Sequence, residues 1–225
     1  MKYKALIFDL DGTLLNTLQD LADSMNTVLH KYGYPTHDTE NYRYFVGAGM
    51  RNLIIKTLPY EHRNDETISL IHAGMIKEYE KRWAYTTKPY PGIPEMLDVI
   101  SASGIPISIF SNKPHAFTLK TVRKLLPKWD FKYVFGAREN VPIKPDPTSA
   151  LEIADKLGIS PDTFVYIGDS GVDMQTAVSA GMHPIGVSWG FRKPQELLSS
   201  GAEHIINDPS ELLDLLCIPT DNSNR

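Results

Sequence analysis

The stretch Ala5-Leu6-Ile7-Phe8-Asp9-Leu10-Asp11-Gly12-Thr13 decides the fold of this chain. Its first four residues form a continuous apolar run, which is typical of a strand buried on both faces of a parallel sheet. Asp9 and Asp11 follow where that strand ends, and residues two apart in an extended chain face the same side. Because ligands of open parallel sheets bind at this edge, the stretch predicts a site with two carboxylates at the end of the first strand.

Two neighbouring carboxylates repel each other unless a cation or a proton separates them. Asp9 and Asp11 therefore suit a hard cation such as Mg²⁺, which prefers oxygen ligands, and equally a nucleophile paired with a general acid and base. Gly12 allows the tight turn that follows. A polar turn that only ends a strand has the same local pattern, so the rest of the chain has to decide between these interpretations.

The composition limits the classes of protein to which the chain can belong. With 225 residues, 42% of them hydrophobic and 22% charged, it can bury a core and has the balance of a soluble globular protein. A formal net charge of −4 argues against nucleic acid as the main partner. No apolar run approaches the roughly 18 residues that a membrane helix needs. The one cysteine, Cys217, cannot form an internal disulfide, which favours a reducing, cytoplasmic location.

The spacing of apolar residues divides the chain into an all-helical segment and an alternating segment. Between about residues 15 and 87 it predicts helices, with no convincing strand; these begin near Leu18, Asn41, Met50 and Asp65. From residue 88 onward helices and strands alternate, which predicts βαβ units and a parallel sheet. Strands are expected at 105–110, 133–135, 164–167, 184–187 and 204–206, and helices at 94–102, 116–126, 148–157, 173–180, 195–199 and near the C-terminus.

The helical segment is inserted directly after the first strand, so it should lie above the carboxyl edge of the sheet and act as a lid. We therefore expect an α/β fold with a Rossmann-like parallel sheet. Residues 1–14 and 88–219 would form this discontinuous core, and residues 15–87 a helical cap inserted after the first strand. The short polar tail 220–225 is expected to be disordered.

The other core strands also end in residues that phosphate chemistry can use. Ser111-Asn112 offers a hydroxyl and backbone donors at the start of a helix, where anions are attracted. Lys144 lies in Pro142-Ile143-Lys144-Pro145-Asp146-Pro147, whose prolines stiffen the backbone. Gly168-Asp169-Ser170-Gly171-Val172-Asp173 adds two carboxylates. The four carboxylates then carry about −4 against +1 from the lysine, so a divalent cation is close to required.

These residues resemble the four motifs of the haloacid dehalogenase-like superfamily of phosphatases, in the expected order: Phe8-Asp9-Leu10-Asp11-Gly12-Thr13-Leu14, Ser111-Asn112, Lys144-Pro145 and Gly168-Asp169-Ser170-x-x-Asp173. The helical insert resembles that superfamily's four-helix type of cap. Other stretches resemble the phosphoglycolate phosphatase-like branch: Phe45-Val46-Gly47-x-Gly49, Tyr90-Pro91-Gly92, Lys144-Pro145-x-Pro147 and Trp189-Gly190-Phe191-Arg192.

The resemblance implies that Asp9 attacks phosphorus to form an aspartyl-phosphate, and that Asp11 protonates the leaving oxygen and then activates water. It implies that Asp9, the Asp11 carbonyl and Asp169 hold Mg²⁺. Asp173 and Ser170 would support these ligands from behind. The residues expected to hold the phosphoryl group or order the loop around it are Gly12, Thr13, Ser111, Asn112 and Lys144, with Thr13 bonded to Asp11.

The cap should set specificity. Gly47-Ala48-Gly49-Met50-Arg51 is a flexible turn entering a helix, and would place the backbone of Gly49 and the guanidinium of Arg51 over the site. Arg51 would suit a small carboxylated substrate through bidentate pairing. An exposed helix arginine is an equally good interpretation. Arg192 could also reach the cleft, although a charge on a surface loop is the favoured interpretation of this residue.

The favoured function is Mg²⁺-dependent hydrolysis of a small phosphomonoester, with 2-phosphoglycolate as first candidate. Asp11 favours phosphate esters over halides, because a halide leaves without being protonated. A phosphosugar mutase resembling β-phosphoglucomutase, and a pyrophosphatase or nucleotidase of the same superfamily, remain alternatives. A non-catalytic phosphate-binding protein is a further one. The expected partner is a small phosphorylated metabolite, with no nucleic acid and no membrane; the sequence leaves open a monomer or a homodimer.

Overall fold

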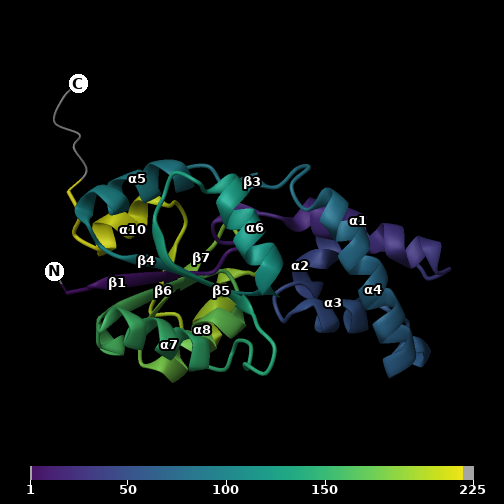
Figure 1. The fold of residues 1–225 in the computed structure, drawn as a ribbon. Coiled ribbons are helices and arrows are strands. Elements are labelled where there is room, and N and C mark those ends of the chain that lie inside the picture. The colour runs from purple at the N-terminus through teal and green to yellow at the C-terminus, as the bar shows by residue number, and fades with distance from the viewer. Residues whose placement is uncertain (1, 220–225) are drawn as a thin grey trace.

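A six-stranded parallel sheet forms the centre of the molecule (Figure 1) in this computed structural model, which describes residues 2–219. Its strand order is β5-β4-β1-β6-β7-β8, and every neighbouring pair is parallel. The α/β fold with a Rossmann-like sheet is thereby confirmed. The strands are β1 (Ala5–Phe8), β4 (Ile107–Pro114), β5 (Phe131–Ala137), β6 (Phe164–Gly168), β7 (His183–Val187) and β8 (His204–Ile206).

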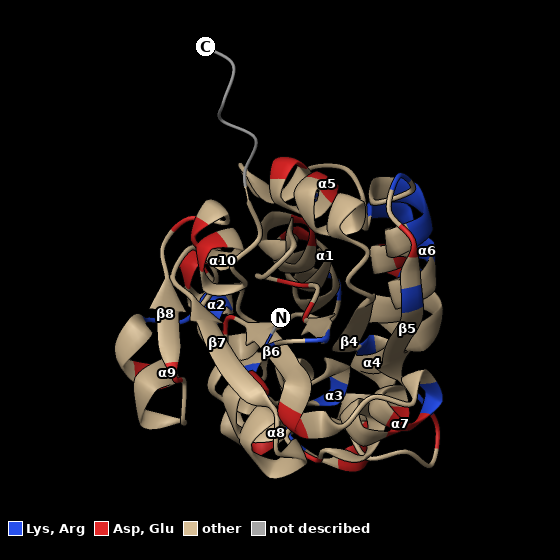
Figure 2. Ribbon diagram, turned by 90° about the vertical axis from the view of Figure 1, so that its left-hand side faces the viewer, with Lys and Arg blue, Asp and Glu red and all other residues tan. Residues whose placement is uncertain are grey.

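Helices cover both faces of this sheet, with α5 and α10 on one face and α7 and α8 on the other (Figure 2). β1 shows why both faces must be covered: Leu6 and Phe8 pack into one apolar cluster, whereas Ala5 and Ile7 pack into the other. The helices of this part are α5 (Ile93–Ser103), α6 (His115–Leu125), α7 (Thr148–Leu157), α8 (Gly171–Ala180), α9 (Pro194–Ser199) and α10 (Ser210–Leu215), with the 3-10 helix η3 (Pro161–Thr163).

The segment after β1 folds into helices beyond the carboxyl ends of the strands (Figure 1). These are α1 (Leu18–Lys31), η1 (Thr39–Asn41), α2 (Tyr42–Phe45), α3 (Met50–Thr57), η2 (Tyr60–His62) and α4 (Asp65–Arg82). They share an apolar cluster of their own, to which the sheet part contributes Phe117 and Phe191. This separate cluster supports the division into a core (1–14 and 88–219) and a cap (15–87), which stays a prediction.

The sequence prediction of no strand between residues 15 and 87 is wrong at its first two positions. β2 (Leu15–Asn16) pairs antiparallel with β3 (Lys88–Pro89), where the chain enters and leaves the cap. A strand of two residues is too short to produce a periodic pattern, so the sequence carries no signal for it. Asp20 lies beside this junction, and its buried carboxylate accepts hydrogen bonds from the backbone and hydroxyl groups of Thr86 and Thr87.

The predicted strands and helices of the core are present, with differences at their ends. β4 continues to Pro114, four residues beyond the predicted end, because residues 111–114 still run beside β5. β5 is longer than predicted at both ends. The tail 220–225, which the sequence predicts to be disordered, lies outside the described residues. None of the helices within residues 2–219 is long and apolar enough to cross a membrane.

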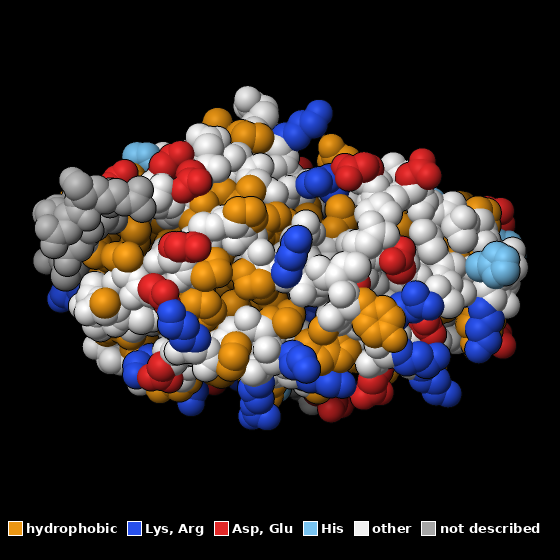
Figure 3. Space-filling view, turned by 90° about the horizontal axis from the view of Figure 1, so that it is seen from above, with side chains coloured by type: hydrophobic (Ala, Val, Ile, Leu, Met, Phe, Trp, Pro, Cys, Tyr) orange, Lys and Arg blue, Asp and Glu red, His pale blue; other side chains and the backbone are white. Residues whose placement is uncertain are grey.

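Acidic and basic side chains are mixed on the surface that lies above α5 and α6. The space-filling view of this face shows Lys and Arg beside Asp and Glu, with small hydrophobic patches between them (Figure 3). Both signs of charge therefore occur together on this face.

Candidate active site

Three carboxylates meet where β1 and β6 end and α8 begins. Oxygen atoms of Asp9, Asp169 and Asp173 lie within 4.8 Å of one another, and all three side chains are buried. The Lys144 Nζ atom lies 2.9 Å from Asp9 Oδ1 and 2.6 Å from Asp173 Oδ1. One buried ammonium thus faces three buried carboxylates.

The pKa values of Asp9 and Asp169 are both raised, first by burial and then by the neighbouring carboxylates. Burial raises the pKa of Asp9 well above its usual value; Lys144 opposes this, while Asp173 and Asp169 raise it further. Burial, and then Asp173, raise the pKa of Asp169 to about 7, against the lowering effect of the Phe191 backbone N–H. A divalent cation bound between the carboxylates would favour their ionised forms.

The atoms around Asp9 and Asp169 fit a hard cation. Asp9 Oδ1 is buried and, within residues 2–219, accepts no hydrogen bond of good geometry, although Lys144 Nζ lies near it. The donor set is oxygen only, which is what Mg²⁺ and Ca²⁺ prefer. Gly12 has φ +92°, and a Cβ atom there would lie 2.3 Å from Asp169 Oδ2, so only glycine allows this close approach.

Asp173 and Ser170 begin α8 with a reciprocal capping box. The Asp173 carboxylate accepts from the Ser170 backbone N–H at 3.0 Å and from the Ser170 hydroxyl. Its other oxygen holds Lys144 at 2.6 Å. The local sequence at a helix start thus fixes the position of the lysine that faces Asp9.

Asn112 joins the two loops that flank the acidic cluster. Its side-chain amide donates to the carbonyl of Lys144 at 3.1 Å and to that of Gly47 at 3.0 Å, while its oxygen accepts from the Lys144 N–H at 2.8 Å. The neighbouring Ser111 hydroxyl is buried and accepts from the Lys113 N–H at 3.3 Å. Asn112 therefore holds the lysine loop in place and also binds the cap.

Thr13 has a different partner from the one that the sequence predicts. Its hydroxyl donates to Asp169 Oδ1 at 3.1 Å, not to Asp11. The turn at Gly12 accounts for this, because it brings the chain after β1 back against the end of β6. Thr13 thus steadies a carboxylate of the acidic cluster.

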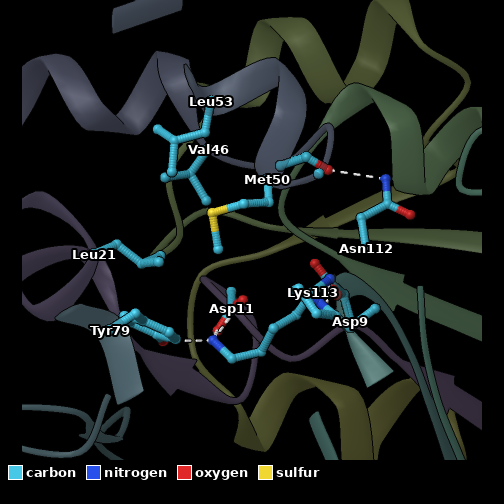
Figure 4. A pocket seen from close by; sticks show the side chains of 13 residues that line it. Asp9, Asp11, Leu21, Val46, Met50, Leu53, Tyr79, Asn112 and Lys113 are labelled. Carbon is cyan, nitrogen blue, oxygen red and sulfur yellow. Dashed lines mark hydrogen bonds and ion pairs between the residues drawn. The ribbon is translucent and has the colours of Figure 1, made fainter. Parts of the chain in front are cut away.

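Asp11 is held by a residue that sequence reasoning missed. The Lys113 Nζ atom lies 3.0 and 3.1 Å from the two carboxylate oxygens of Asp11, and also donates to the Tyr79 hydroxyl at 2.6 Å (Figure 4). A signal for Lys113 existed: because β4 continues past Phe110, Ser111 and Lys113 lie two apart on one extended strand.

A small, partly open cavity of about 40 Å³ lies between the core and the cap, beside Asp9 and Asp11. By the space that one water needs, it holds on the order of three water molecules. The cap contributes the apolar side chains of Leu21, Val46, Met50 and Leu53 to its wall (Figure 4), together with Tyr79, Gly47 and Gly49. Gly49, predicted to face the site, does line this cavity.

Neither arginine considered for substrate contact lines the cavity. Arg51 turns outward on α3: its side chain is 62% exposed and pairs with Asp65 at 2.6 Å. The structure thus contradicts a place for Arg51 over the site and matches the alternative of an exposed helix arginine. Arg192 is half-buried, donates to the carbonyl of Val46 at 2.7 Å and lies 3.3 Å from Glu196.

The chain belongs to the haloacid dehalogenase-like hydrolase family, whose sequence profile matches residues 6–187. A phosphoglycolate phosphatase of Nitrosospira multiformis is 30% identical over 219 residues, which is 95% of each chain. An N-acetylmuramic acid 6-phosphate phosphatase of Pseudomonas aeruginosa is 29% identical over 217 residues, 96% of each chain. A Lactobacillus delbrueckii structure, provisionally assigned as a phosphoglycolate phosphatase, superposes with a TM-score of 0.90 at 28% identity and covers 96% of this chain and 99% of its own. The predicted resemblance to this family is thus confirmed.

Proposed function

We propose that this protein is a Mg²⁺-dependent phosphomonoester hydrolase that acts through an aspartyl-phosphate on Asp9. One observation carries the proposal: the buried Asp9 carboxylate lies beside Lys144 and two further carboxylates at the wall of a small cavity. The two relatives compared above are both named as phosphatases, which supports the same chemistry.

In this proposal the reaction has two steps at phosphorus. An Asp9 oxygen forms a bond to phosphorus while the bond to the ester oxygen breaks, and Asp11 gives a proton to that leaving oxygen. Asp11 then takes a proton from water, whose oxygen attacks the phosphorus and frees the Asp9 carboxylate. Splitting hydrolysis in this way replaces one difficult step by two easier ones.

The remaining residues of the site hold the phosphoryl group and the cation. Lys144, the Ser111 hydroxyl and the Asn112 backbone N–H would bind the phosphoryl oxygens, where fixed donors stabilise developing charge. Asp9, the Asp11 carbonyl and Asp169 would hold Mg²⁺, which supplies positive charge against the phosphoryl oxygens. Thr13 and the capping box of α8 keep these groups in place.

We propose 2-phosphoglycolate as the first substrate to test, and N-acetylmuramic acid 6-phosphate as the second. The small volume of the cavity favours the smaller substrate, because it leaves less room for a sugar ring. The single cysteine supports a cytoplasmic location for the enzyme.

The test is phosphate release with Mg²⁺ across 2-phosphoglycolate, N-acetylmuramic acid 6-phosphate, glucose 1-phosphate, nucleoside monophosphates and pyrophosphate. We expect the highest kcat/KM for 2-phosphoglycolate, with activity lost on chelation and in Asp9→Asn. The matched control is Asp155→Asn, an exposed aspartate on α7, which should retain full activity. Glucose 6-phosphate formed from glucose 1-phosphate without free phosphate would instead establish a mutase. No phosphate from any of these compounds, with Mg²⁺ bound, would overturn the proposal.

A further inference from the structure

Lys113 is a buried cation at the wall of the cavity, and the four sequence motifs give it no role. Its side chain is only 3% exposed, although burial of an ammonium is costly unless partners compensate for it. It has partners on both sides of the cavity: the Asp11 carboxylate in the core and the Tyr79 hydroxyl in the cap. It is therefore built into the contact between the two parts of the molecule.

The contact with Asp11 restrains the carboxylate that is proposed to move protons. Nζ lies at nearly equal distances, 3.0 and 3.1 Å, from the two Asp11 oxygens. A cation that contacts both oxygens of an aspartate carboxylate limits the rotation of the carboxylate about the Cβ–Cγ bond. The Asp11 side chain is 12% exposed and lines the cavity, so without this contact it would be free to turn.

The contact with Tyr79 comes from the cap. Tyr79 lies on α4, is fully buried, and packs edge-on against Phe117 of α6, with ring centroids 5.2 Å apart. Its hydroxyl reaches Lys113 only while α4 lies against the core. If the cap moved away, Lys113 would exchange this partner for water.

We infer that Lys113 is the residue that positions Asp11 for proton transfer, and that the Tyr79 hydroxyl is the contact by which the closed cap holds Lys113. The inference rests on the proposed function, because it gives Asp11 the acid and base role. Lys113 is thus a positioning residue: it acts through Asp11 rather than on the reacting atoms.

The test compares leaving groups, because protonation by Asp11 matters only where the leaving oxygen needs a proton. Ethyl phosphate releases an alkoxide that needs one, whereas acetyl phosphate, of similar size, releases acetate that does not. The kcat/KM value reports the steps up to the first irreversible one, here the transfer to Asp9. General acid catalysis contributes roughly 10²–10⁴-fold, so we expect Lys113→Met to lower kcat/KM about 30-fold for ethyl phosphate and less than about threefold for acetyl phosphate.

Tyr79→Phe provides a second variant that keeps the ring and its packing on Phe117. It should show the same difference between the two leaving groups, but a smaller one, about a fivefold loss for ethyl phosphate, because Lys113 loses one neutral acceptor. This variant tests the inference if Lys113→Met does not fold. The matched control is Tyr42→Phe, another fully buried cap tyrosine, whose hydroxyl donates to Asn26 at 2.7 Å. It should leave both substrates unchanged.

Three results would overturn the inference. Equal losses for ethyl and acetyl phosphate would indicate that Lys113 binds the phosphoryl group or only supports the fold. A loss confined to 2-phosphoglycolate, with ethyl phosphate unchanged, would indicate that Lys113 binds a substrate carboxylate. Unchanged kinetics in both variants would show that the contact is incidental. If the unmodified enzyme releases phosphate neither from these three compounds nor from any other compound of the panel above, the proposed function itself fails.

Discussion

Replacing Lys144 by Met would remove the ammonium between Asp9 and Asp173 and keep a side chain of similar length. At the observed distances of 2.9 and 2.6 Å, the gross attraction is about 6 kcal/mol for each pair at an effective dielectric constant of about 20. Desolvation of three buried groups offsets much of this. Breaking such a buried pair costs about 3–5 kcal/mol, because it leaves charges without a partner.

The cost of Lys144→Met should depend on pH. Burial already raises the pKa of Asp9 although Lys144 opposes it, so the carboxyl of the variant will take up a proton more readily still. A group whose folded pKa is raised contributes stability below its unfolded pKa, and that stability is lost as pH rises through the folded pKa. The free energy of unfolding should therefore fall by about 3–5 kcal/mol at pH 8, and by less at pH 5.

Urea unfolding followed by tryptophan fluorescence, with EDTA present, measures this difference. The matched control is Lys156→Met, whose half-exposed ammonium lies 3.9 Å from Glu152 and should contribute less than about 1 kcal/mol. A loss below about 1 kcal/mol for Lys144→Met at pH 8, or an equal loss at both pH values, would refute the reasoning about buried charge.

Three other changes have expected outcomes. In EDTA the melting temperature should be lower at pH 8 than at pH 5, because the pKa of Asp169 is raised to about 7 and its ionisation in the folded protein is therefore costly. Added Mg²⁺ should raise the melting temperature more at pH 8 than at pH 5, because the carboxylates that would bind it are then ionised. Differential scanning fluorimetry gives both values, and a larger Mg²⁺ effect at pH 5 would contradict the charge argument. Arg51→Ala should leave the KM for 2-phosphoglycolate unchanged, since the guanidinium pairs with Asp65 on the surface; steady-state kinetics would contradict this with a rise beyond about threefold. Asp20→Ala should lower the free energy of unfolding by about 3 kcal/mol in urea titrations, because it leaves the donors of the two threonines at 86 and 87 without an acceptor; a loss within about 0.5 kcal/mol would show that water replaces the carboxylate.

The sequence predicted the sheet and the acidic cluster for the same physical reason. A buried parallel strand reads as an apolar run, and the polar residues that follow must lie at the sheet edge. Asp9, Asp169 and Lys144 could therefore be assigned to one edge before any contact was known. The strand order follows less directly, because apolar runs do not say which strands are neighbours.

Contacts between residues that are distant in the chain could not be predicted from the sequence. Thr13 bonds to Asp169, 156 positions away, and Lys113 bonds to Asp11, 102 positions away. No local pattern distinguishes these partners from nearer ones. Arg51 shows the opposite failure: its position beside two glycines favoured the site, but the rotation of α3 points it toward Asp65. The direction of the Arg51 side chain depends on which face of α3 packs against the rest of the cap. The eight residues of this helix have too mixed a composition to predict that face from the sequence.

The loop at 46–49 connects the acidic site to the cap through its backbone. Arg192, next to the Phe191 N–H that binds Asp169, donates to the carbonyl of Val46, and Asn112 donates to the carbonyl of Gly47. Both core contacts thus bind main-chain oxygens, so neither depends on a side chain of the loop, although φ +115° at Gly47 favours glycine there. The residues that shape the cavity wall can therefore change while the closing contacts persist.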